Sequence, residues 1–328
     1  KLVSLQKAMY TSLKERTTDV KVPDKWKTDE GDITLVIAEK ESAEATTIVS
    51  DIVNRISTGI QPNDICILCK QLPQKYTLQI IKKLEQCGIR ARIENDYQDL
   101  IKEPIVDLFL NFMLCVCDRK HPVEWSFVEN TLLEIWGIGT TQENAMYDQM
   151  LLKLSSFADE IAMKVHAGLD STQWHFVLSE MLQFFDTAKI KAMFPQYMQG
   201  TFFDDLICEF EKLFWNEYLA SEGNWNLAIE NFRGEHSIPI MTIHKSKGLE
   251  YTAVYFIGLE DAAFWNFKNN PDEDRCAFFV ALSRAKKAVT FTFCKNRLNF
   301  KYTAQKHTDI NEFFMLLQQP GIANVIFT

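Results

Sequence analysis

Short, continuous apolar runs alternate with helically spaced apolar positions in the first third of the chain. Residues 33–38 and 65–69 are apolar or β-branched throughout, which predicts two buried strands. Apolar side chains recur at helical spacing over residues 45–56, and Gly59 follows as a helix-ending residue. A second helix is predicted from about residue 74 to residue 85. Strands that are apolar on both faces and alternate with helices indicate an α/β fold, with a parallel sheet flanked by helices.

The pattern between about residues 103 and 233 is helical, with few strand signals. Beyond it, strand patterns return at residues 238–243, 253–259 and 289–294, and a helix is predicted at residues 272–287. The simplest architecture is one α/β domain that is split in sequence by an all-helical insertion. We therefore predict a discontinuous α/β domain at residues 1–117 and 236–328, and an inserted helical domain at residues 118–235.

Composition places the chain among soluble globular proteins, because 47% of its 328 residues are hydrophobic and 24% are charged. No apolar run approaches the ~20 residues that are needed to span a bilayer, so we expect no membrane contact. The eight cysteines and six histidines show neither a disulfide framework nor metal-ligand spacing. We therefore expect a reducing, cytoplasmic setting and no metal site.

Charge is distributed unevenly along the chain. The formal net charge of −9 argues against a protein that coats nucleic acid through bulk positive charge. Residues 275–308 nevertheless contain no Asp or Glu, and the basic residues there are Arg275, Arg284, Lys286, Lys287, Lys295, Arg297, Lys301 and Lys306. This stretch is either a solvated basic face or part of a local basic groove.

The densest chemical signal is a polar turn over residues 241–250, directly after a predicted strand. Thr242, His244 and two lysines surround Gly248, and a glycine lets backbone N–H groups approach an anion closely. Glu250 does not suit a phosphate, but a carboxylate accepts hydrogen bonds well from a sugar hydroxyl. A nucleotide site and a surface loop that is basic by chance both account for this turn.

The second signal is the predicted helix at residues 272–287. Acidic residues open this helix and Lys286 and Lys287 close it, as the helix dipole favours. Arg284 lies on the same face as Ala277 and Ala281, and burying an unpaired guanidinium is costly. Arg284 is therefore expected to have a partner, either in a structural salt bridge or on a phosphate across a domain cleft.

These two motifs together resemble those of a known family. The run Thr242-x-His244-x-x-Lys247-Gly248-Leu249-Glu250 is similar to motif V of the UvrD/Rep/PcrA superfamily 1 DNA helicases. The run from Glu273 to the Val-Ala-Leu-Ser-Arg-Ala of residues 280–285 is similar to their motif VI. Weaker similarity at residues 64–70, 102–107 and 136–139 extends the resemblance over most of the chain. It implies the second of two RecA-like (P-loop NTPase type) domains that clamp ATP between them, with an inserted helical domain.

The resemblance also implies roles for individual residues. Arg284 would be the catalytic arginine finger on the γ-phosphate, Glu250 would bind the ribose, and Gly248 would belong to the ATP-binding turn. The implied DNA contacts are Lys70, Thr242, His244 and Phe300. Lys70 stands where the family has an Arg. Phe300 falls where the family stacks an aromatic ring on a base, and an ordinary core phenylalanine explains it equally well.

No G-x-x-x-x-G-K-[ST] sequence occurs in the chain, so it has no such loop of its own to cradle phosphates. We therefore expect the C-terminal half of an ATP-dependent 3′-to-5′ DNA helicase, which is inactive alone. The N-terminal motor domain, with the Mg²⁺ ligands, is expected to precede Lys1. Expected partners are single-stranded DNA, a duplex junction and that motor domain, in a monomeric protein.

Two other interpretations stay open. A degenerate domain that keeps DNA or protein contacts would be a binding module without a motor, and an upstream phosphate-binding lysine would argue against it. A RecB-like helicase–nuclease ranks lower, because no carboxylate cluster of a nuclease is visible near residue 328.

Overall fold

The computed structural model describes residues 5, 31–118, 120–139, 145–298 and 303–328. The chain forms two compact units, and each is described by itself. The first unit comprises Lys1–Asn95 and His236–Thr328, and the second comprises Asp96–Glu235. We call them the α/β unit and the helical unit.

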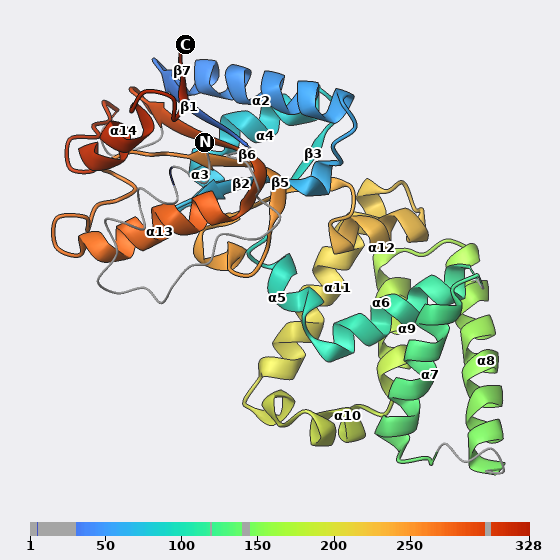
Figure 1. Ribbon diagram of the computed structural model, residues 1–328. Coiled ribbons are helices and arrows are strands. Elements are labelled where there is room, and N and C mark those ends of the chain that lie inside the picture. Colours follow the sequence, from blue (N-terminus) through green and yellow to red (C-terminus); the bar gives the residue numbers. More distant parts are fainter. Residues whose placement is uncertain (1–4, 6–30, 119, 140–144, 299–302) are drawn as a thin grey trace. The chain divides into compact units, whose positions relative to one another are not determined.

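A seven-stranded sheet forms the centre of the α/β unit, in the order β3-β4-β2-β5-β6-β1-β7 (Figure 1). Every neighbouring pair of strands is parallel. The prediction of an α/β fold with a parallel, RecA-like sheet is therefore confirmed. The strands are β1 Asp32–Ala38, β2 Ile65–Cys69, β3 Arg90–Ile93, β4 Ser237–Thr242, β5 Tyr251–Ile257, β6 Ala285–Cys294 and β7 Asn324–Phe327.

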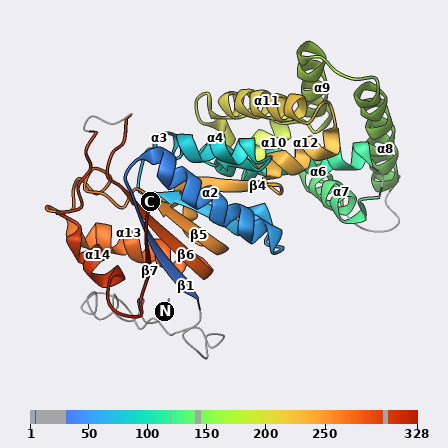
Figure 2. The ribbon, with the colours of Figure 1, turned by 90° about the horizontal axis from the view of Figure 1, so that it is seen from above.

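Helices cover both faces of this sheet. Helices α2 and α4 lie on one face, and α13 and α14 lie on the other (Figures 1 and 2). Phe278 of α13 packs between the sheet and α14, because its ring centroid lies 4.6 Å from that of Phe291 and 4.4 Å from that of Phe313. The helices are α2 Glu41–Ser57, α3 Pro73–Tyr76, α4 Leu78–Gln86, α13 Pro271–Ser283 and α14 Asn311–Leu317, with short 3-10 turns η1 Pro62–Asp64 and η3 His244–Ser246.

The helix that was predicted at residues 272–287 ends early. Helix α13 stops at Ser283, and its last turn contains no basic residue. Lys286 and Lys287 belong to β6, so the prediction that lysines close this helix is wrong. Strand pairing decides the boundary, because Ala285 already lies opposite Tyr251 of β5. The prediction failed because a basic pair after an apolar run fits a helix end and a strand start equally well.

Two edge strands and one helix break were not predicted. Strands β3 and β7 form the two edges of the sheet, and neither has the continuous apolar run that marks the central strands. The helix predicted at residues 74–85 is divided at Thr77 into α3 and α4. The Thr77 hydroxyl donates to the Pro73 carbonyl oxygen at 2.8 Å, which satisfies the end of the first turn.

The described part of the helical unit consists of helices around an aromatic core. Helix α6 is buried along most of its length and packs on α7, α8 and α12. It therefore groups with the helical unit, although the sequence analysis placed residues 104–117 in the α/β domain. The elements are α5 Tyr97–Ile101, α6 Pro104–Cys117, α7 Pro122–Trp136, α8 Ala145–His166, α9 Ser171–Phe184, α10 Thr187–Met193, η2 Pro195–Met198, α11 Phe202–Ala220 and α12 Trp225–Arg233.

Candidate functional site

Three of the predicted DNA-contact residues lie at one edge of the sheet. Thr242 ends β4 and lies opposite Cys69, the last residue of β2. Lys70 follows Cys69 directly, and His244 lies two residues after Thr242. The carboxyl ends of parallel strands form the usual ligand edge of an α/β sheet. We call Lys70, Thr242 and His244 the carboxyl-edge cluster.

The predicted nucleotide contacts lie at the opposite edge. Glu250 directly precedes β5, Arg284 directly precedes β6, and the first residues of these strands lie opposite each other. The polar turn that the sequence presents as one signal is therefore divided between two edges, because residues 243–250 cross back over the sheet to start a parallel strand. We call Gly248, Glu250 and Arg284 the amino-edge cluster.

Local hydrogen bonds fix the turn of the amino-edge cluster. The Leu249 N–H donates to the Ser246 carbonyl oxygen at 3.0 Å. The buried Ser246 hydroxyl donates to the Ile243 carbonyl oxygen at 2.7 Å. Gly248 has a φ of +86°, a left-handed conformation that glycine adopts without steric cost. Gly248 and Glu250 are both exposed, so this turn presents backbone and a carboxylate to the solvent.

Arg284 ties the end of α13 to the same turn. Its Nη1 donates to the carbonyl oxygens of Leu249 at 2.9 Å and Ser246 at 3.4 Å. Its Nη2 donates to the Ser283 hydroxyl at 2.9 Å. Among the described residues, these bonds leave an Nη2 hydrogen available for a further acceptor. The partner that the sequence predicts for Arg284 is therefore provided mainly by backbone carbonyl oxygens.

Electrostatics links Arg284 to Glu250. Burial lowers the pKa of the half-buried Arg284 guanidinium, and the nearby Glu250 carboxylate opposes this shift. Arginine stays protonated in proteins, so this edge carries a positive and a negative group side by side. Such a pair can recognise a ligand that has both an anionic group and hydroxyl donors.

Lys70 of the carboxyl-edge cluster is engaged in an ion pair. Its Nζ lies 2.5 Å from Oδ1 of Asp274 on α13, and both side chains are largely buried. The ion pair joins the end of β2 to the first turn of α13. His244 is exposed and Thr242 is half-buried, so these two side chains remain accessible from the solvent.

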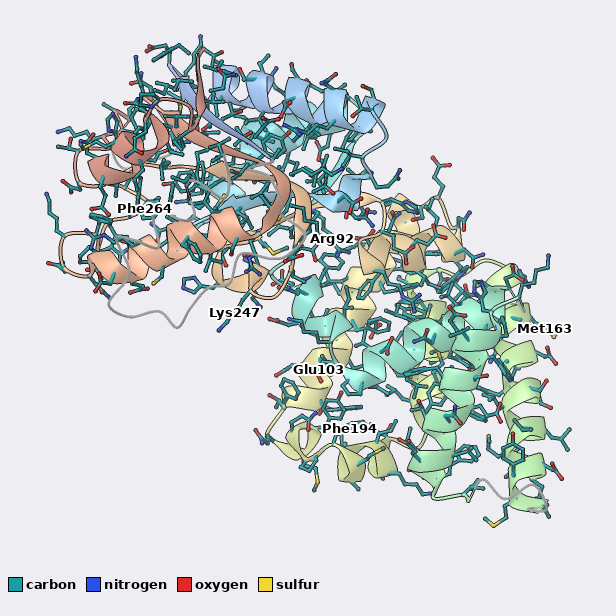
Figure 3. All side chains as sticks on the ribbon, in the orientation of Figure 1. Arg92, Glu103, Met163, Phe194, Lys247 and Phe264 are labelled. Carbon is teal, nitrogen blue, oxygen red and sulfur yellow. The ribbon has the colours of Figure 1, made fainter. Side chains whose placement is uncertain are left out.

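A pocket opens beside this cluster. Its volume is 280 Å³, and its lining includes Lys70, His244 and the first turn of α13. Figure 3 labels Phe264, which contributes to this pocket, and Lys247, which lies in the turn toward the amino-edge cluster. The full lining is Lys70, Gln71, His244, Ala263, Phe264, Trp265, Asn266, Glu273 and Asp274.

One protein-family model matches a part of this chain that contains both clusters, with the exception of Lys70. The model of the UvrD-like helicase C-terminal domain matches residues 218–296. We call residues 218–296 the UvrD-like domain, after the family model that they match. The UvrD-like domain includes β4, β5, α13 and β6, and therefore the whole amino-edge cluster. It also includes Thr242 and His244.

Curated relatives of the UvrD-like domain are DNA helicases. The putative ATP-dependent DNA helicase YjcD of Bacillus subtilis (strain 168) is 25% identical over 292 residues, which cover 78% of this chain and 37% of that protein. ATP-dependent DNA helicase Rep of Escherichia coli (strain K12) is 39% identical over 19% of this chain and 10% of its own length. For ATP-dependent DNA helicase PcrA of Bacillus subtilis (strain 168), identity is 32% over 23% of this chain and 11% of PcrA. The chain thus spans well under two thirds of each relative, and distant homology extends over much of the chain.

A buried charge network supports the carboxyl edge of the sheet in the α/β unit. Arg297 is fully buried, and its Nη1 and Nη2 donate to the two carboxylate oxygens of Glu44 at 2.8 Å each. Its Nε donates to Glu260, which follows β5. The guanidinium also lies 4.9 Å from the ring centroid of Tyr76. This network joins the start of α2 to the segments that follow β5 and β6.

The network predicts a pH-dependent stability. Burial raises the pKa of the Glu260 carboxyl to about 7, against the opposing effect of the Arg297 guanidinium. The folded-state pKa is above the ordinary value of 4.5, so the protonated Glu260 carboxyl stabilises the folded state. This stabilisation is complete below about pH 4.5 and is lost as the pH rises through about 7. We expect this loss to be on the order of 3 kcal/mol.

Glu260→Gln is expected to remove this part of the pH dependence, because the amide does not titrate. Urea unfolding at pH 5, 6, 7 and 8 measures the effect, with Glu39→Gln as a control. Glu39 also pairs with a basic residue, Lys295, but both side chains are exposed. Parallel pH curves for wild type and Glu260→Gln would contradict the expected role.

Sequence reasoning missed three residues of this edge, namely Trp265, Asp274 and Arg297. Arg297 was noted as one member of a basic stretch, and no local signal marks it as buried. Asp274 was assigned to the helix dipole, although it pairs with Lys70 across 204 positions. Trp265 stands between two phenylalanines in a segment that follows a buried strand, which is a usable signal. Phe300 lies outside the described residues.

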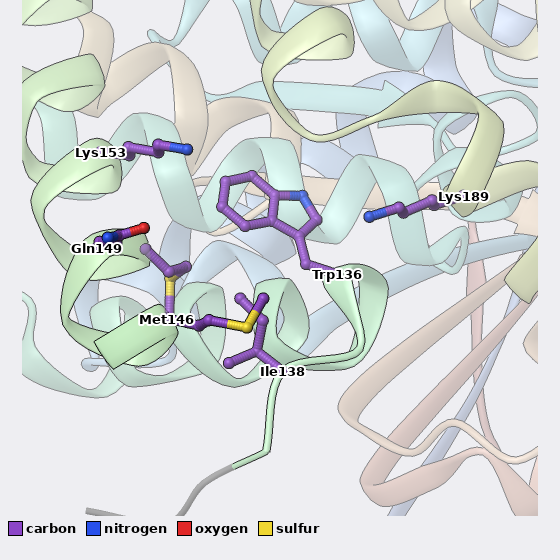
Figure 4. Close-up of a pocket in the computed structure, with 7 residues that line it drawn as sticks. Trp136, Ile138, Met146, Gln149, Lys153 and Lys189 are labelled. Carbon is purple, nitrogen blue, oxygen red and sulfur yellow. The ribbon is translucent and has the colours of Figure 1, made fainter. Parts of the chain in front are cut away.

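The helical unit has a pocket of its own. It has a volume of 170 Å³ and contains no predicted site residue. Lys153 and Lys189 extend toward Trp136 from opposite sides (Figure 4). Trp136 ends α7, directly before the Gly137-Ile138-Gly139 turn.

Among the described residues, no group of three or more His, Cys, Asp or Glu side chains could hold a metal ion. The described helices also include none that is both long and apolar enough to cross a membrane. All eight cysteines are free thiols, and Cys66 and Cys69 are buried in β2.

Proposed function

We propose that this chain is the C-terminal half of an ATP-dependent DNA helicase or translocase, and that it supplies one wall of an ATP site shared with another motor domain. The observation that carries the proposal is the side-by-side position of Arg284 and Glu250 at the amino edge of a parallel sheet. The chain has no phosphate-binding loop, so this edge needs a second domain to complete a nucleotide site. A 3′-to-5′ direction of movement rests on the family resemblance alone.

At the shared site, each residue of the amino-edge cluster has a distinct role. Glu250 accepts hydrogen bonds from the ribose hydroxyls, and the turn at Gly248 lets the nucleotide approach the backbone. Arg284 acts as the arginine finger, because a guanidinium beside the γ-phosphate stabilises the charge that builds up in the transition state. Its bonds to the turn hold it in place before the nucleotide binds.

In nucleotide sites, Mg²⁺ is usually held by one or two carboxylates together with the phosphates of the nucleotide. The proposal therefore assigns Mg²⁺ binding to the domain that holds the phosphates. No step that this chain performs passes through the metal ion.

The carboxyl-edge cluster is the proposed DNA site. Thr242, His244 and Lys70 are the proposed contacts of the strand. Phe300 remains a proposed stacking residue outside the described range. The proposal assigns the α/β unit to the RecA-like domain and the helical unit to its insertion. Single-stranded DNA, a duplex junction and the ATP-binding motor domain are the proposed partners of a monomeric protein.

A test of this function measures ATP turnover and DNA binding with the purified chain. We expect no Mg²⁺-dependent ATP hydrolysis by the chain alone, and binding of single-stranded oligonucleotides that weakens as salt is raised. The double variant Thr242→Ala/His244→Ala is expected to bind more weakly, whereas Lys153→Ala in the helical unit serves as a basic control. Robust ATP turnover by the isolated chain would rule out a shared site.

A binding module without a motor is the second candidate. The observation that favours it is that the chain has no G-x-x-x-x-G-K-[ST] phosphate-binding loop of its own. Adding an ATP-binding motor domain distinguishes the two candidates. DNA-stimulated ATP hydrolysis would support the motor, and unchanged DNA binding without hydrolysis would support the module.

A further inference from the structure

Trp265 is exposed at the carboxyl edge of the α/β unit. Its exposed fraction is 70%, and it is the only exposed tryptophan among the residues that the structure describes. Exposing a large indole ring costs free energy, because most of its surface is apolar. An exposed tryptophan that lines a pocket is therefore a candidate contact for a ligand.

The segment that carries Trp265 is firmly anchored. Phe264 and Phe267 are buried on either side of it, and their ring centroids lie 5.7 Å and 5.5 Å from that of Phe313. The Phe264 N–H donates to the Glu260 carbonyl oxygen at 3.1 Å. Two buried neighbours hold the backbone of Trp265, so the ring can bind a partner at a small cost in conformational entropy.

The charges of the pocket favour an uncharged ligand surface over a phosphate. Lys70 is neutralised by Asp274 at 2.5 Å, and Glu273 adds a further negative charge to the lining. A phosphate would be repelled by this acidic lining. An aromatic, uncharged ring can instead lie against the indole face.

Asp274, in the lining of the pocket, has a buried carboxylate oxygen that lacks a hydrogen-bond donor from the described part of the chain. Asp274 is 3% exposed, and its Oδ2 has no hydrogen-bond partner among the described residues. A buried acceptor without a donor is costly, so a ligand with an N–H group fits this place. Every nucleobase of DNA carries at least one N–H donor on its edge, and every base has a π-face.

We propose that Trp265 is a stacking platform for one nucleobase of single-stranded DNA, with the base edge directed toward Asp274. This inference rests on the proposed function and names how the carboxyl edge grips the strand. The phosphodiester backbone then passes outside the pocket, on the side of the exposed His244. Stacking of this kind does not depend on base identity, as a translocating protein requires.

The test compares two oligomers of equal length and charge, oligothymidylate and a deoxyribose-phosphate oligomer that lacks all bases. Affinities of the purified chain for both are measured by fluorescence anisotropy over a range of salt concentrations. Wild type is expected to prefer oligothymidylate. In Trp265→Ala this preference is expected to fall roughly 5- to 150-fold, the range for the loss of one base–aromatic stack.

Three further results are expected if the ring stacks on a base. Trp265→Phe retains most of the preference, because phenylalanine also has a π-face. The salt dependence of binding is unchanged in Trp265→Ala, because no phosphate contact is removed. Phe176→Ala, which removes a 61% exposed ring from α9 of the helical unit, binds both oligomers as wild type does.

Contrary outcomes separate this inference from the function on which it rests. Suppose that wild type binds oligothymidylate and that Trp265→Ala has the wild-type affinity for each of the two oligomers. The stacking role is then overturned, and the proposed function stands. Equal weakening toward both oligomers would also overturn stacking and would assign Trp265 a structural role. If wild type binds neither oligomer, both the proposed function and the stacking role are overturned.

Discussion

Arg297→Ala is expected to lower the stability of the α/β unit by about 3–5 kcal/mol at pH 7, the largest effect of any single substitution considered. The guanidinium is fully buried and balances Glu44 and Glu260, which are themselves 1% and 0% exposed. Its removal leaves these carboxylates together in a low-dielectric interior without a counter-charge. The effect is measured by urea or thermal unfolding of Arg297→Ala, in comparison with wild type and with the variants Lys295→Ala and Arg297→Lys.

Lys295→Ala is the matched control, two residues earlier on the same connection. Lys295 pairs with Glu39, but the two side chains are 46% and 64% exposed, so the loss is expected to stay below about 1 kcal/mol. Arg297→Lys keeps the charge but not the planar fork that bonds Glu44 twice, and it should fall between the two. Equal stability of Arg297→Ala and Lys295→Ala would show that the network contributes little.

Arg284→Ala is expected to lower the rate of ATP hydrolysis by about 10³-fold or more, with ATP binding largely kept. The measurement requires the ATP-binding motor domain, in the same polypeptide or added to it. Loss of an arginine finger removes a contact that is strongest in the transition state, so kcat falls while the affinity for ATP changes little.

Folding must be checked in the same variant, because Arg284 also donates to the Leu249 and Ser246 carbonyl oxygens. We expect this structural loss to be about 1–2 kcal/mol, which leaves the fold intact. Lys286→Ala is the matched control, since Lys286 is an exposed basic residue at the start of β6. Loss of ATP binding with normal turnover at saturation would contradict the finger role.

The central strands could be predicted because the sequence of each strand alone indicates that it is buried. In β2 all five residues are buried, and the sequence Ile-Cys-Ile-Leu-Cys shows this directly. The edge strand β3 has the sequence Arg-Ala-Arg-Ile, in which half-buried residues leave no such signal. The end of α13 depends on the pairing of Ala285 with Tyr251, which lies far away in sequence.

The candidate site was predictable in its residue types and not in its layout. The family resemblance named Glu250 and Arg284, and the structure places them as neighbours through the parallel pairing of β5 with β6. No local pattern shows that Thr242 and Glu250, eight positions apart, lie at opposite edges of the sheet. The Lys70–Asp274 ion pair likewise depends on the assembled fold, because nothing near either residue marks the other.

The strand order has a consequence for how this protein is made. Strand β2 lies between β4 and β5, and β1 lies between β6 and β7, so the early strands insert between strands that a ribosome produces only after the helical unit. The helical unit is continuous in sequence and can fold as soon as it emerges. The first two strands must meanwhile wait as unpaired apolar segments, which makes folding slow and exposes the nascent chain to aggregation. Translation that stops before residue 236 leaves both strands without any neighbour in the sheet.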